Sequence, residues 1–402
     1  MGNKKYRAAW VFALLLACAC SGLKNHPASE AGSKQVAPRP EWDRVFARSS
    51  GWTGGDVAAS FIITGNRVLW VFGDSFVGGV ENNRHVKAVL VNNTIAIHPY
   101  DPAHPGKAPS PDAVKFYWGA PDSSGKPTAW IKPMQQGEFK SWYWPTGGGV
   151  VLATPERGFA LALFLVQLEK KPGDDTVWGF RTIGSELAMI DDVEAPAPDW
   201  QPRIIELPFH IEHQHGSAKG EEVEWGVAAF FKPASGLGPD YVFIYGTRSR
   251  NSRERDLVLA RARPESFERF EQWEFFAGNG QWLKSPGKAV PVVSGVASEI
   301  SVDKIVGMDG VRYVMVYGEP LFGNRIFMRT ARHPQGPWSD FNPVFTVPDT
   351  LQSKTLFAYA AKGHAALSQP GTLLVSYIIS SHEFSELYNN ASLYHPRFLT
   401  IK

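Results

Sequence analysis

The fold is decided by the stretch from Trp52 to Asp74, which reads WTGGDVAASFIITGNRVLWVFGD. Two apolar runs of strand composition flank Thr64-Gly65-Asn66, whose Gly and Asn suit a tight turn. An antiparallel hairpin centred on Gly65 places Asp56 opposite Asp74, with β-carbons about 5 Å apart. Paired carboxylates of unequal pKa serve general acid/base hydrolysis. The alternative is that both aspartates only cap turns at the ends of strands.

A second hairpin of the same construction is predicted between Glu299 and Glu319. The dipeptide Asp309-Gly310 lies between two β-rich runs, and a hairpin centred on Asp309 puts Glu299 opposite Glu319. We therefore take Glu299 as a third candidate catalytic residue, beside the two aspartates. Glu319 is a candidate substrate-binding residue.

The N-terminal segment has the organisation of a secretory signal. A basic start and an apolar run from Ala8 to Ala17 precede small residues around Cys18, and the run is too short for a spanning helix. Leu15-Leu16-Ala17-Cys18 resembles the lipobox of bacterial lipoproteins, which implies lipidation of Cys18, with Cys20 as a weaker candidate. An ordinary secretory signal is the alternative. Because Ala19 follows the cysteine, the resemblance implies a lipoprotein of the bacterial cell envelope, at the outer membrane.

The domain organisation follows from composition. We expect residues 1–20 to form the signal and lipobox, residues 21–40 a polar flexible tether, and residues 41–402 one large domain. The chain has only two cysteines, both in the signal, so the domain forms no internal disulfide and depends on its core. A formal net charge of +2 without a basic stripe indicates that nucleic acid is not a partner.

Short β-rich runs bounded by Gly, Pro, Asn and Asp predict an all-β chain. Five runs resemble versions of one strand, beginning at Arg67, Phe159, Asp240, Val311 and Gly371. An inner strand is predicted before each, over 56–63, 147–153, 224–231, 299–306 and 363–368. The aromatic positions taken as equivalent are Phe72, Phe164, Tyr245, Tyr317 and Tyr377.

Radial repetition of such sheets is the β-propeller solution, so the predicted fold is a five-bladed β-propeller. A two-sheet sandwich with long loops is the alternative. We also expect 41–48 to pair with the C-terminal strand 397–401 and close the ring.

Several motifs together resemble a known family: GWTGGD, LWVFGDS, VNNTIAIH, SWYWPTGGG, VEWGVA and ASEIS. The chain from about Gly51 to Lys402 is similar to the bacterial five-bladed β-propeller glycosidase-like proteins, including the group with endo-D-arabinofuranase activity. The resemblance implies an axial funnel in which carboxylates of the inner strands meet a sugar. Asp56 in GGD and Asp74 in FGD match its acidic positions.

Aromatic and histidine residues supply the remaining candidates. A sugar ring offers an apolar face to Trp and Tyr rings, so Trp52, Trp144 and Trp225 are candidate substrate-binding residues, with Trp52 and Trp144 expected in the funnel. His364 is expected near the axis, where it contacts a substrate hydroxyl or a structural cation, or else serves only the structure. His210, His213 and His215 are interpreted as part of a solvated loop rather than a metal site. No cofactor is expected beyond such a cation.

These observations predict a lipid-anchored glycoside hydrolase that acts on a furanosidic polysaccharide. A non-catalytic surface glycan-binding propeller is the alternative, because it needs the aromatic residues but not unequal carboxylates. Gly73-Asp74-Ser75 also resembles the GDS block of serine esterases, whose Asp-x-x-His motif occurs here only at Asp101–His104 in a proline-rich loop.

Overall fold

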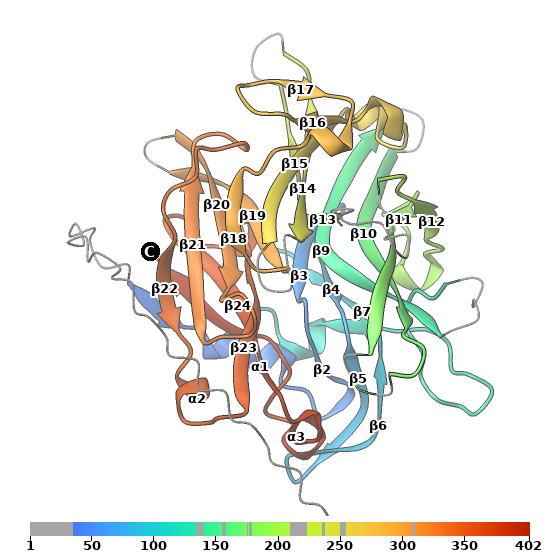
Figure 1. Ribbon diagram of the computed structural model, residues 1–402. Coiled ribbons are helices and arrows are strands. Elements are labelled where there is room, and N and C mark those ends of the chain that lie inside the picture. The colour runs from blue at the N-terminus through green and yellow to red at the C-terminus, as the bar shows by residue number, and fades with distance from the viewer. Residues whose placement is uncertain are drawn as a thin grey trace, which may run out of the picture. The chain divides into compact units, whose positions relative to one another are not determined.

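The structure is a computed structural model that describes residues 35–133, 140–154, 158–174, 176, 179–209, 223–234, 238–249, 255–307 and 310–402. These residues lie in one compact unit, Gln35–Lys402, in which strands predominate (Figure 1). The prediction of an all-β chain is confirmed. The α-helices are short: α1 (Pro40–Phe46), α2 (Pro348–Leu351) and α3 (Phe384–Asn389). Among the described residues, no helix has the length and apolar character needed to cross a membrane.

Five antiparallel sheets each begin with a hairpin, in chain order. The first contains β3 (Ala59–Ile63), β4 (Arg67–Phe72), β7 (Thr94–Pro99) and β8 (Lys115–Tyr117). The second contains β9 (Ser141–Thr154), β10 (Gly158–Lys170), β11 (Phe180–Ile190) and β12 (Arg203–Glu206). The third contains β13 (Val223–Lys232), β14 (Tyr241–Ser249), β15 (Arg255–Ala262), β16 (Glu274–Phe276), β17 (Trp282–Leu283) and β18 (Val293–Val296).

The fourth sheet contains β19 (Ile300–Gly307), β20 (Gly310–Gly318), β21 (Arg325–Ala331) and β22 (Asn342–Thr346). The fifth contains β23 (Leu356–Gly363), β24 (Leu373–Ser381), β25 (Arg397–Ile401) and β1 (Val36–Pro38). A sixth, three-stranded sheet contains β2 (Ser50–Gly55), β5 (Ser75–Glu81) and β6 (Arg84–Val91). The described residues thus form six sheets, not the two of a sandwich.

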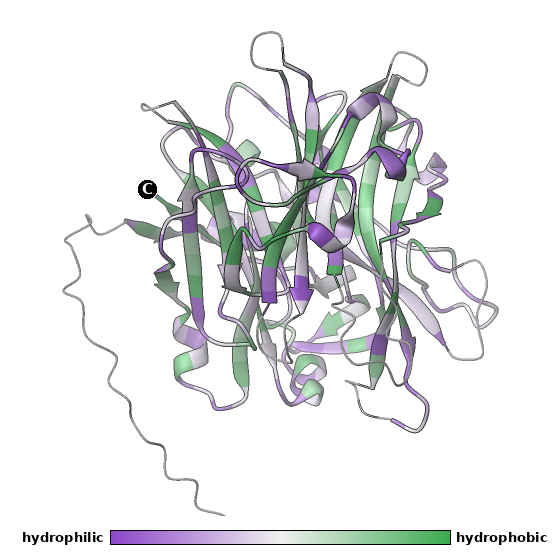
Figure 2. Ribbon diagram, turned by 45° about the horizontal axis from the view of Figure 1, so that its top comes forward, coloured by the Kyte–Doolittle hydropathy of each residue, from purple (hydrophilic) through white to green (hydrophobic). Residues whose placement is uncertain are grey.

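Apolar layers fill the spaces between successive sheets. One layer packs the first sheet on the second, another the second on the third, and another the third on the fourth. The largest layer joins the fifth sheet both to the fourth and to the first. The five aromatic positions taken as equivalent in the sequence are all buried in these layers, including Phe72, Tyr245 and Tyr317, for which we predict burial from the repeat. Figure 2 shows that many residues along the strands are hydrophobic, drawn in green.

Three boundaries differ from the sequence prediction. Residues 41–48 do not pair with the C-terminal strand; most of them form α1, because the pairing partner of β25 is β1, which lies inside the predicted tether. The fifth inner strand is Leu356–Gly363, and the predicted segment 363–368 begins at the end of that strand and contains a short 3-10 turn over Ala365–Leu367. A single third strand is predicted over the apolar run 89–98, which contains the VNNTIAIH motif, but Asn92 and Asn93 break it into β6 and β7, which belong to different sheets.

The two predicted hairpins have different outcomes. Ala59 pairs with Val71 and Ile63 with Arg67, which is the register of a hairpin centred on Gly65, so this prediction is confirmed. In the second hairpin Gly307 pairs with Gly310. This two-residue connection, the favoured hairpin length, shifts the register by one residue from a centre at Asp309. Glu299 is consequently not opposite Glu319, and that prediction is wrong.

Glu186 of β11 is a buried carboxylate whose cross-strand neighbour is another acid, Glu206. Burial, followed by the charge of Glu206, raises the pKa of Glu186 to about 8. When the pKa of an acid is higher in the folded state than in the unfolded state, the folded protein loses stability as the pH rises from the unfolded-state pKa to the folded-state pKa.

We therefore expect Glu186→Gln to be more stable than the wild type at pH 9, with a free energy of unfolding higher by on the order of 2–4 kcal/mol. At pH 4 the two proteins should differ little in stability. Urea unfolding at both pH values measures this. Glu206→Gln is the matched control and should give a smaller gain, because it removes only the neighbouring charge. Equal wild-type and Glu186→Gln stability at pH 9 would show that the buried carboxylate carries no penalty.

Candidate active site

Two aspartates meet where one long β-ribbon passes from the first sheet into the three-stranded sheet. Asp56 follows β2 and precedes β3, and Asp74 lies between β4 and β5. Gly55 pairs with Ser75, and the backbone N–H of Asp56 donates to the carbonyl of Asp74 at 3.2 Å. The break at Asn92 between β6 and β7 falls at the same level of the ribbon. The junction therefore collects two carboxylates and an amide.

The Asp56 carboxylate is held by two tyrosines from the distant C-terminal part of the chain. Its Oδ2 accepts hydrogen bonds from the hydroxyls of Tyr359, at 2.7 Å, and Tyr394, at 2.8 Å. Burial of the carboxyl, then the charges of Asp74 and Glu299, raise the pKa of Asp56 well above its ordinary value. The two hydroxyl donors oppose that rise, because they favour the ionised form.

The Asp74 carboxylate has a different set of donors. Its Oδ1 accepts from the indole Nε1 of Trp144 at 2.8 Å and from the Nδ2 of Asn92 at 3.1 Å. Burial raises the pKa of Asp74 to about 6, against the effect of these two donors. Adjacent carboxylates with different partners and different pKa values can divide the roles of acid and base.

Glu299 borders the same region from the fourth sheet. Its Oε2 lies 3.3 Å from the Nζ of Lys362, a buried lysine on β23, and Gly147 of β9 leaves room for that side chain because a Cβ there would lie 2.9 Å from Nζ. A cavity of about 220 Å³ is lined by Glu299, by Glu319 and by Tyr359, the donor to Asp56. Tyr359 thus connects the cavity to Asp56, although neither aspartate lines it. Glu319 forms an ion pair with Arg325 at its edge.

Backbone strain gathers around this site. Positive φ angles, which non-glycine residues rarely adopt, occur next to the donors and carboxylates and at the edge of the cavity. Among the described residues they include Val57, Ala58, Leu321, Phe322, Ala360 and Tyr394. Val57 is β-branched, and its φ of 64° is a particularly costly case. Such outliers persist only where surrounding structure enforces them, and they concentrate at functional sites.

Two of the three candidate tryptophans do not face the site. Trp52 is buried and stacks on Phe116, with ring centroids 4.7 Å apart, inside the core. Trp225 is equally buried against Phe275. Both were wrongly expected to bind substrate, because the hydrophobic area of an indole suits a core as well as a sugar. Trp144 alone contacts a carboxylate of the site.

His364 serves the structure rather than the site. It is buried, its two ring nitrogens hydrogen-bond the hydroxyls of Ser60 and Ser376, and its ring packs against Trp70. Burial lowers the pKa of His364 to about 3, so the ring is neutral. With both nitrogens engaged, it neither contacts substrate nor offers a ligand to a cation, and the expectation of such a role is wrong.

The esterase-like motif, the histidine-rich segment, Cys18 and a metal site are the other features considered from the sequence. Ser75 is buried and donates to the carbonyl of Gly73, while Asp101 and His104 bond each other in an exposed turn, so the serine-esterase arrangement is absent from the described residues. The histidines of 210–215 and Cys18 lie outside the described residues. Among the described residues, no group of three or more His, Cys, Asp or Glu side chains could hold a metal ion.

Sequence reasoning missed the residues that hold the carboxylates. Tyr359, Tyr394, Asn92 and Lys362 were not candidates, although Asn92 lies in the VNNT motif that carried the family resemblance. The tyrosines are separated from Asp56 by more than 300 residues, so no local pattern connects them.

The chain matches one protein family and shares its fold with a solved structure. Residues 40–402 match the family described as Domain of unknown function (DUF5005), and the chain belongs to that family. No curated protein matches the chain. The crystal structure of a hydrolase candidate from Bacteroides ovatus is similar with a TM-score of 0.66 and 18% identity, over 91% of this chain and 90% of that chain.

Two weaker similarities are to sugar-cleaving enzymes. The exo-β-1,3-galactanase of Phanerochaete chrysosporium gives a TM-score of 0.44 at 8% identity, over 92% of this chain and 64% of that chain. The α-L-arabinofuranosidase of Lactobacillus brevis gives 0.40 at 11% identity, over 87% and 90%. The Bacteroides ovatus structure establishes a shared fold, and no activity follows from any of the three.

Proposed function

We propose that the protein is a glycoside hydrolase that cleaves a polysaccharide by carboxylate acid/base catalysis. The observation that carries the proposal is the meeting of Asp56 and Asp74, two adjacent carboxyls with raised pKa values and separate donor sets. Tyr359, a donor to Asp56, lines a cavity that Glu299 also lines. Glycoside hydrolysis needs one carboxylic acid to protonate the leaving oxygen and one carboxylate to act as base or nucleophile.

In the proposed division of roles, Asp56 holds the proton and Asp74 is ionised. Two nearby negative charges favour the protonated form of Asp56, and two neutral donors stabilise the charge on Asp74. Asp56 donates its proton to the glycosidic oxygen as the bond to the sugar breaks. Asp74 acts as the carboxylate that serves as base or nucleophile at the sugar carbon. Glu299, which forms an ion pair with Lys362 and lines the cavity, is the third carboxylate of the proposed site. This chemistry requires no cofactor.

We also propose that the five hairpin-first sheets are five blades of a propeller. Their first strands contact one another in chain order, from β3 through β9, β13 and β19 to β23. The hydrogen bond between Ser60 and His364 connects the fifth sheet back to the first, and β1 adds the N-terminal segment to the fifth sheet. In this arrangement Asp56 and Glu299 lie just before the inner strands β3 and β19, and Asp74 follows β4 next to Asp56, at one mouth of the axis.

The rate of hydrolysis should follow a bell-shaped pH profile. The acidic limb should rise through about pH 6, where Asp74 becomes ionised, and the basic limb should fall as Asp56 loses its proton. In Trp144→Phe the acidic limb should move to higher pH, because the lost donor favoured the charged carboxylate. Initial rates between pH 4 and 9 measure both limbs. An acidic limb unmoved by Trp144→Phe would exclude Asp74 as the group that must ionise.

The proposed substrate is a furanosidic polysaccharide, supported by the sequence resemblance to the endo-D-arabinofuranase group. The Bacteroides ovatus protein of the same fold is described as a hydrolase candidate, which agrees with a hydrolytic role. Mass spectrometry of products after incubation with arabinans, arabinogalactans and other polysaccharides tests this. Short oligosaccharides are expected from at least one furanosidic polymer. Binding without any cleavage would instead support the non-catalytic glycan-binding propeller.

We further propose that Cys18 is lipidated and anchors the protein in the cell envelope, at the outer membrane. Because several acyl chains anchor far more strongly than one, the wild type should fractionate with membranes. Cys18→Ser should release the protein or leave its signal uncleaved, and Cys20→Ser is the matched control that should change neither. Mass spectrometry that finds an unmodified N-terminus after Cys20 would contradict the anchor.

A further inference from the structure

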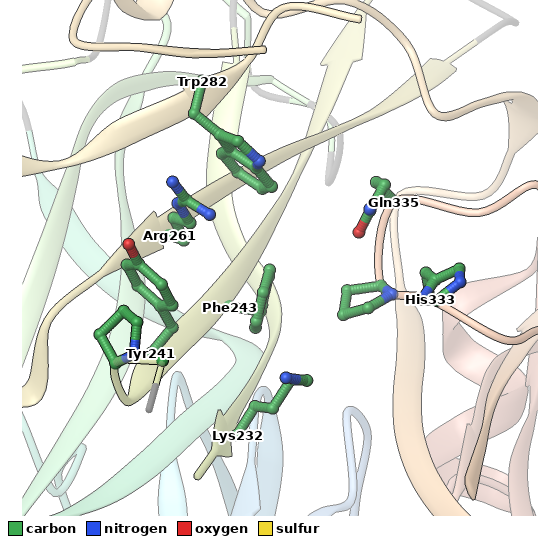
Figure 3. A pocket seen from close by; sticks show the side chains of 10 residues that line it. Lys232, Tyr241, Phe243, Arg261, Trp282, His333 and Gln335 are labelled. Atoms are coloured by element: carbon green, nitrogen blue, oxygen red, sulfur yellow. The ribbon is translucent and has the colours of Figure 1, made fainter. Parts of the chain in front are cut away.

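A second cavity, of about 250 Å³, lies between the third and fourth sheets (Figure 3). One wall comes from β14, β15 and β17, and the other from the loop that follows β21. It shares no lining residue with the cavity at Glu299. Arg255, which lines that first cavity, pairs with Glu224 near the start of β13, whereas Lys232 of the second cavity ends β13. The two cavities are therefore separated by roughly 25 Å along one strand.

Arg261 is the fixed centre of the first wall. Its guanidinium lies 4.2 Å from the ring centroid of Tyr241 and 4.2 Å from that of Trp282, and its Nε donates to Glu274 at 2.7 Å. Among the described residues this is its only hydrogen bond. The terminal Nη groups are thus held in place, and their N–H donors have no hydrogen-bond partner among the described residues. They have the fork geometry that matches a carboxylate or a sulfate.

The opposite wall carries further polar groups. Figure 3 shows Gln335 and His333 across the opening from Tyr241 and Trp282, with Lys232 between the two walls. Lys232 forms no ion pair with any residue that the structure describes. Cationic donors, an amide and aromatic surface therefore surround one open space. An apolar pocket with a few convergent polar groups is the usual form of a small-ligand site.

We propose that this cavity is a second carbohydrate-binding site, which takes a sugar unit bearing an anionic group. The Tyr241 and Trp282 rings border the sugar with apolar surface, Arg261 and Lys232 bind the anion, and Gln335 meets a hydroxyl. The anion is a carboxylate or a sulfate ester, since both fit the guanidinium fork. The site goes beyond the proposed hydrolysis and does not depend on it, because it binds sugar far from the carboxylates.

Calorimetric titration of the whole protein tests the proposal with three probes of similar length: an oligogalacturonate, which carries carboxylates only, a carrageenan-derived oligosaccharide, which carries sulfate esters only, and a neutral galacto-oligosaccharide. We expect the carboxylated or the sulfated probe to bind at least tenfold more tightly than the neutral one, and the preferred probe identifies the anion. Arg261→Gln and Lys232→Ala should each weaken that binding at least tenfold. Asp74→Asn, at the proposed catalytic site, should leave it unchanged.

Arg329→Gln is the matched control, because Arg329 also packs over an aromatic ring, that of Phe341, but lines neither cavity. It should bind like the wild type. An equal loss in Arg329→Gln would reveal non-specific charge attraction and overturn the proposal, as would the absence of binding by both anionic probes. Loss of binding in Asp74→Asn would place the sugar at the catalytic site instead. Lys232→Ala, a change near the surface, decides the matter if Arg261→Gln fails to fold.

Discussion

Replacing Asp56 or Asp74 by Asn is expected to lower the rate of sugar release at least about a hundredfold while the protein still folds. A general acid or base typically contributes this much, and Asn keeps the volume of Asp but cannot exchange a proton at neutral pH. In Asp74→Asn, the amide oxygen of the new side chain would still accept from Trp144 and Asn92, the present donors to Asp74. Initial rates on the identified substrate, together with thermal unfolding, measure the two effects separately.

The stability outcome distinguishes a catalytic role from a structural one. Each carboxyl has a raised pKa, which means that folding disfavours its ionised form, so an uncharged Asn should leave the unfolding temperature equal or higher at neutral pH. Asp101→Asn, in an exposed turn, is the matched control and should keep full activity. Glu299→Gln should show a similar loss if Glu299 is the acid, and a much smaller one if the two aspartates suffice. Full turnover in both aspartate variants would overturn the assignment.

Gly226→Ala is expected to abolish stable folding, with a cost of at least about 4 kcal/mol. Gly226 of β13 has a φ of 85°, and a Cβ there would lie 1.9 Å from Cγ of the buried Phe164 in β10. The backbone of Gly226 also touches β9, because a Cβ on Gly148 would lie 2.0 Å from its carbonyl oxygen. The second and third sheets therefore have no space for one added methyl group.

Gly280→Ala is the matched control for the backbone term. Gly280 has a φ of 72°, but a Cβ there would meet nothing within 4 Å. Its cost should be only about 1–2 kcal/mol, the penalty of a left-handed conformation. Circular dichroism and urea unfolding of the two variants measure the difference. Similar stabilities would mean that the second and third sheets do not pack as described.

The sequence supported the first hairpin well because its turn and its strand patterns agree. Gly65 and Asn66 both have positive φ in the turn, and this tight turn fixes the register of the two apolar runs that flank it. Asp56 and Asp74 could therefore be placed together from local information alone. The second hairpin offered two adjacent centres, and a shift of one residue was enough to separate Glu299 from Glu319.

The rest of the site depends on contacts between distant parts of the chain. Composition cannot distinguish Trp52, buried in the core, from Trp144, which donates to Asp74, since indoles serve both purposes. Nor does any periodicity indicate that Tyr359 and Tyr394 reach Asp56. Packing of the fifth sheet against the first brings them there, and that packing is a property of the whole fold.

Release of new reducing ends from a polysaccharide panel, by the wild type and by the Asp56→Asn/Asp74→Asn double variant, tests whether the two aspartates catalyse glycoside hydrolysis. The wild type should release them saturably from at least one furanosidic polymer, and the double variant, which should unfold at the same or a higher temperature, should release none above background. Undiminished release by the folded double variant would contradict this expectation, as would a wild type that binds the polymer and never cleaves it.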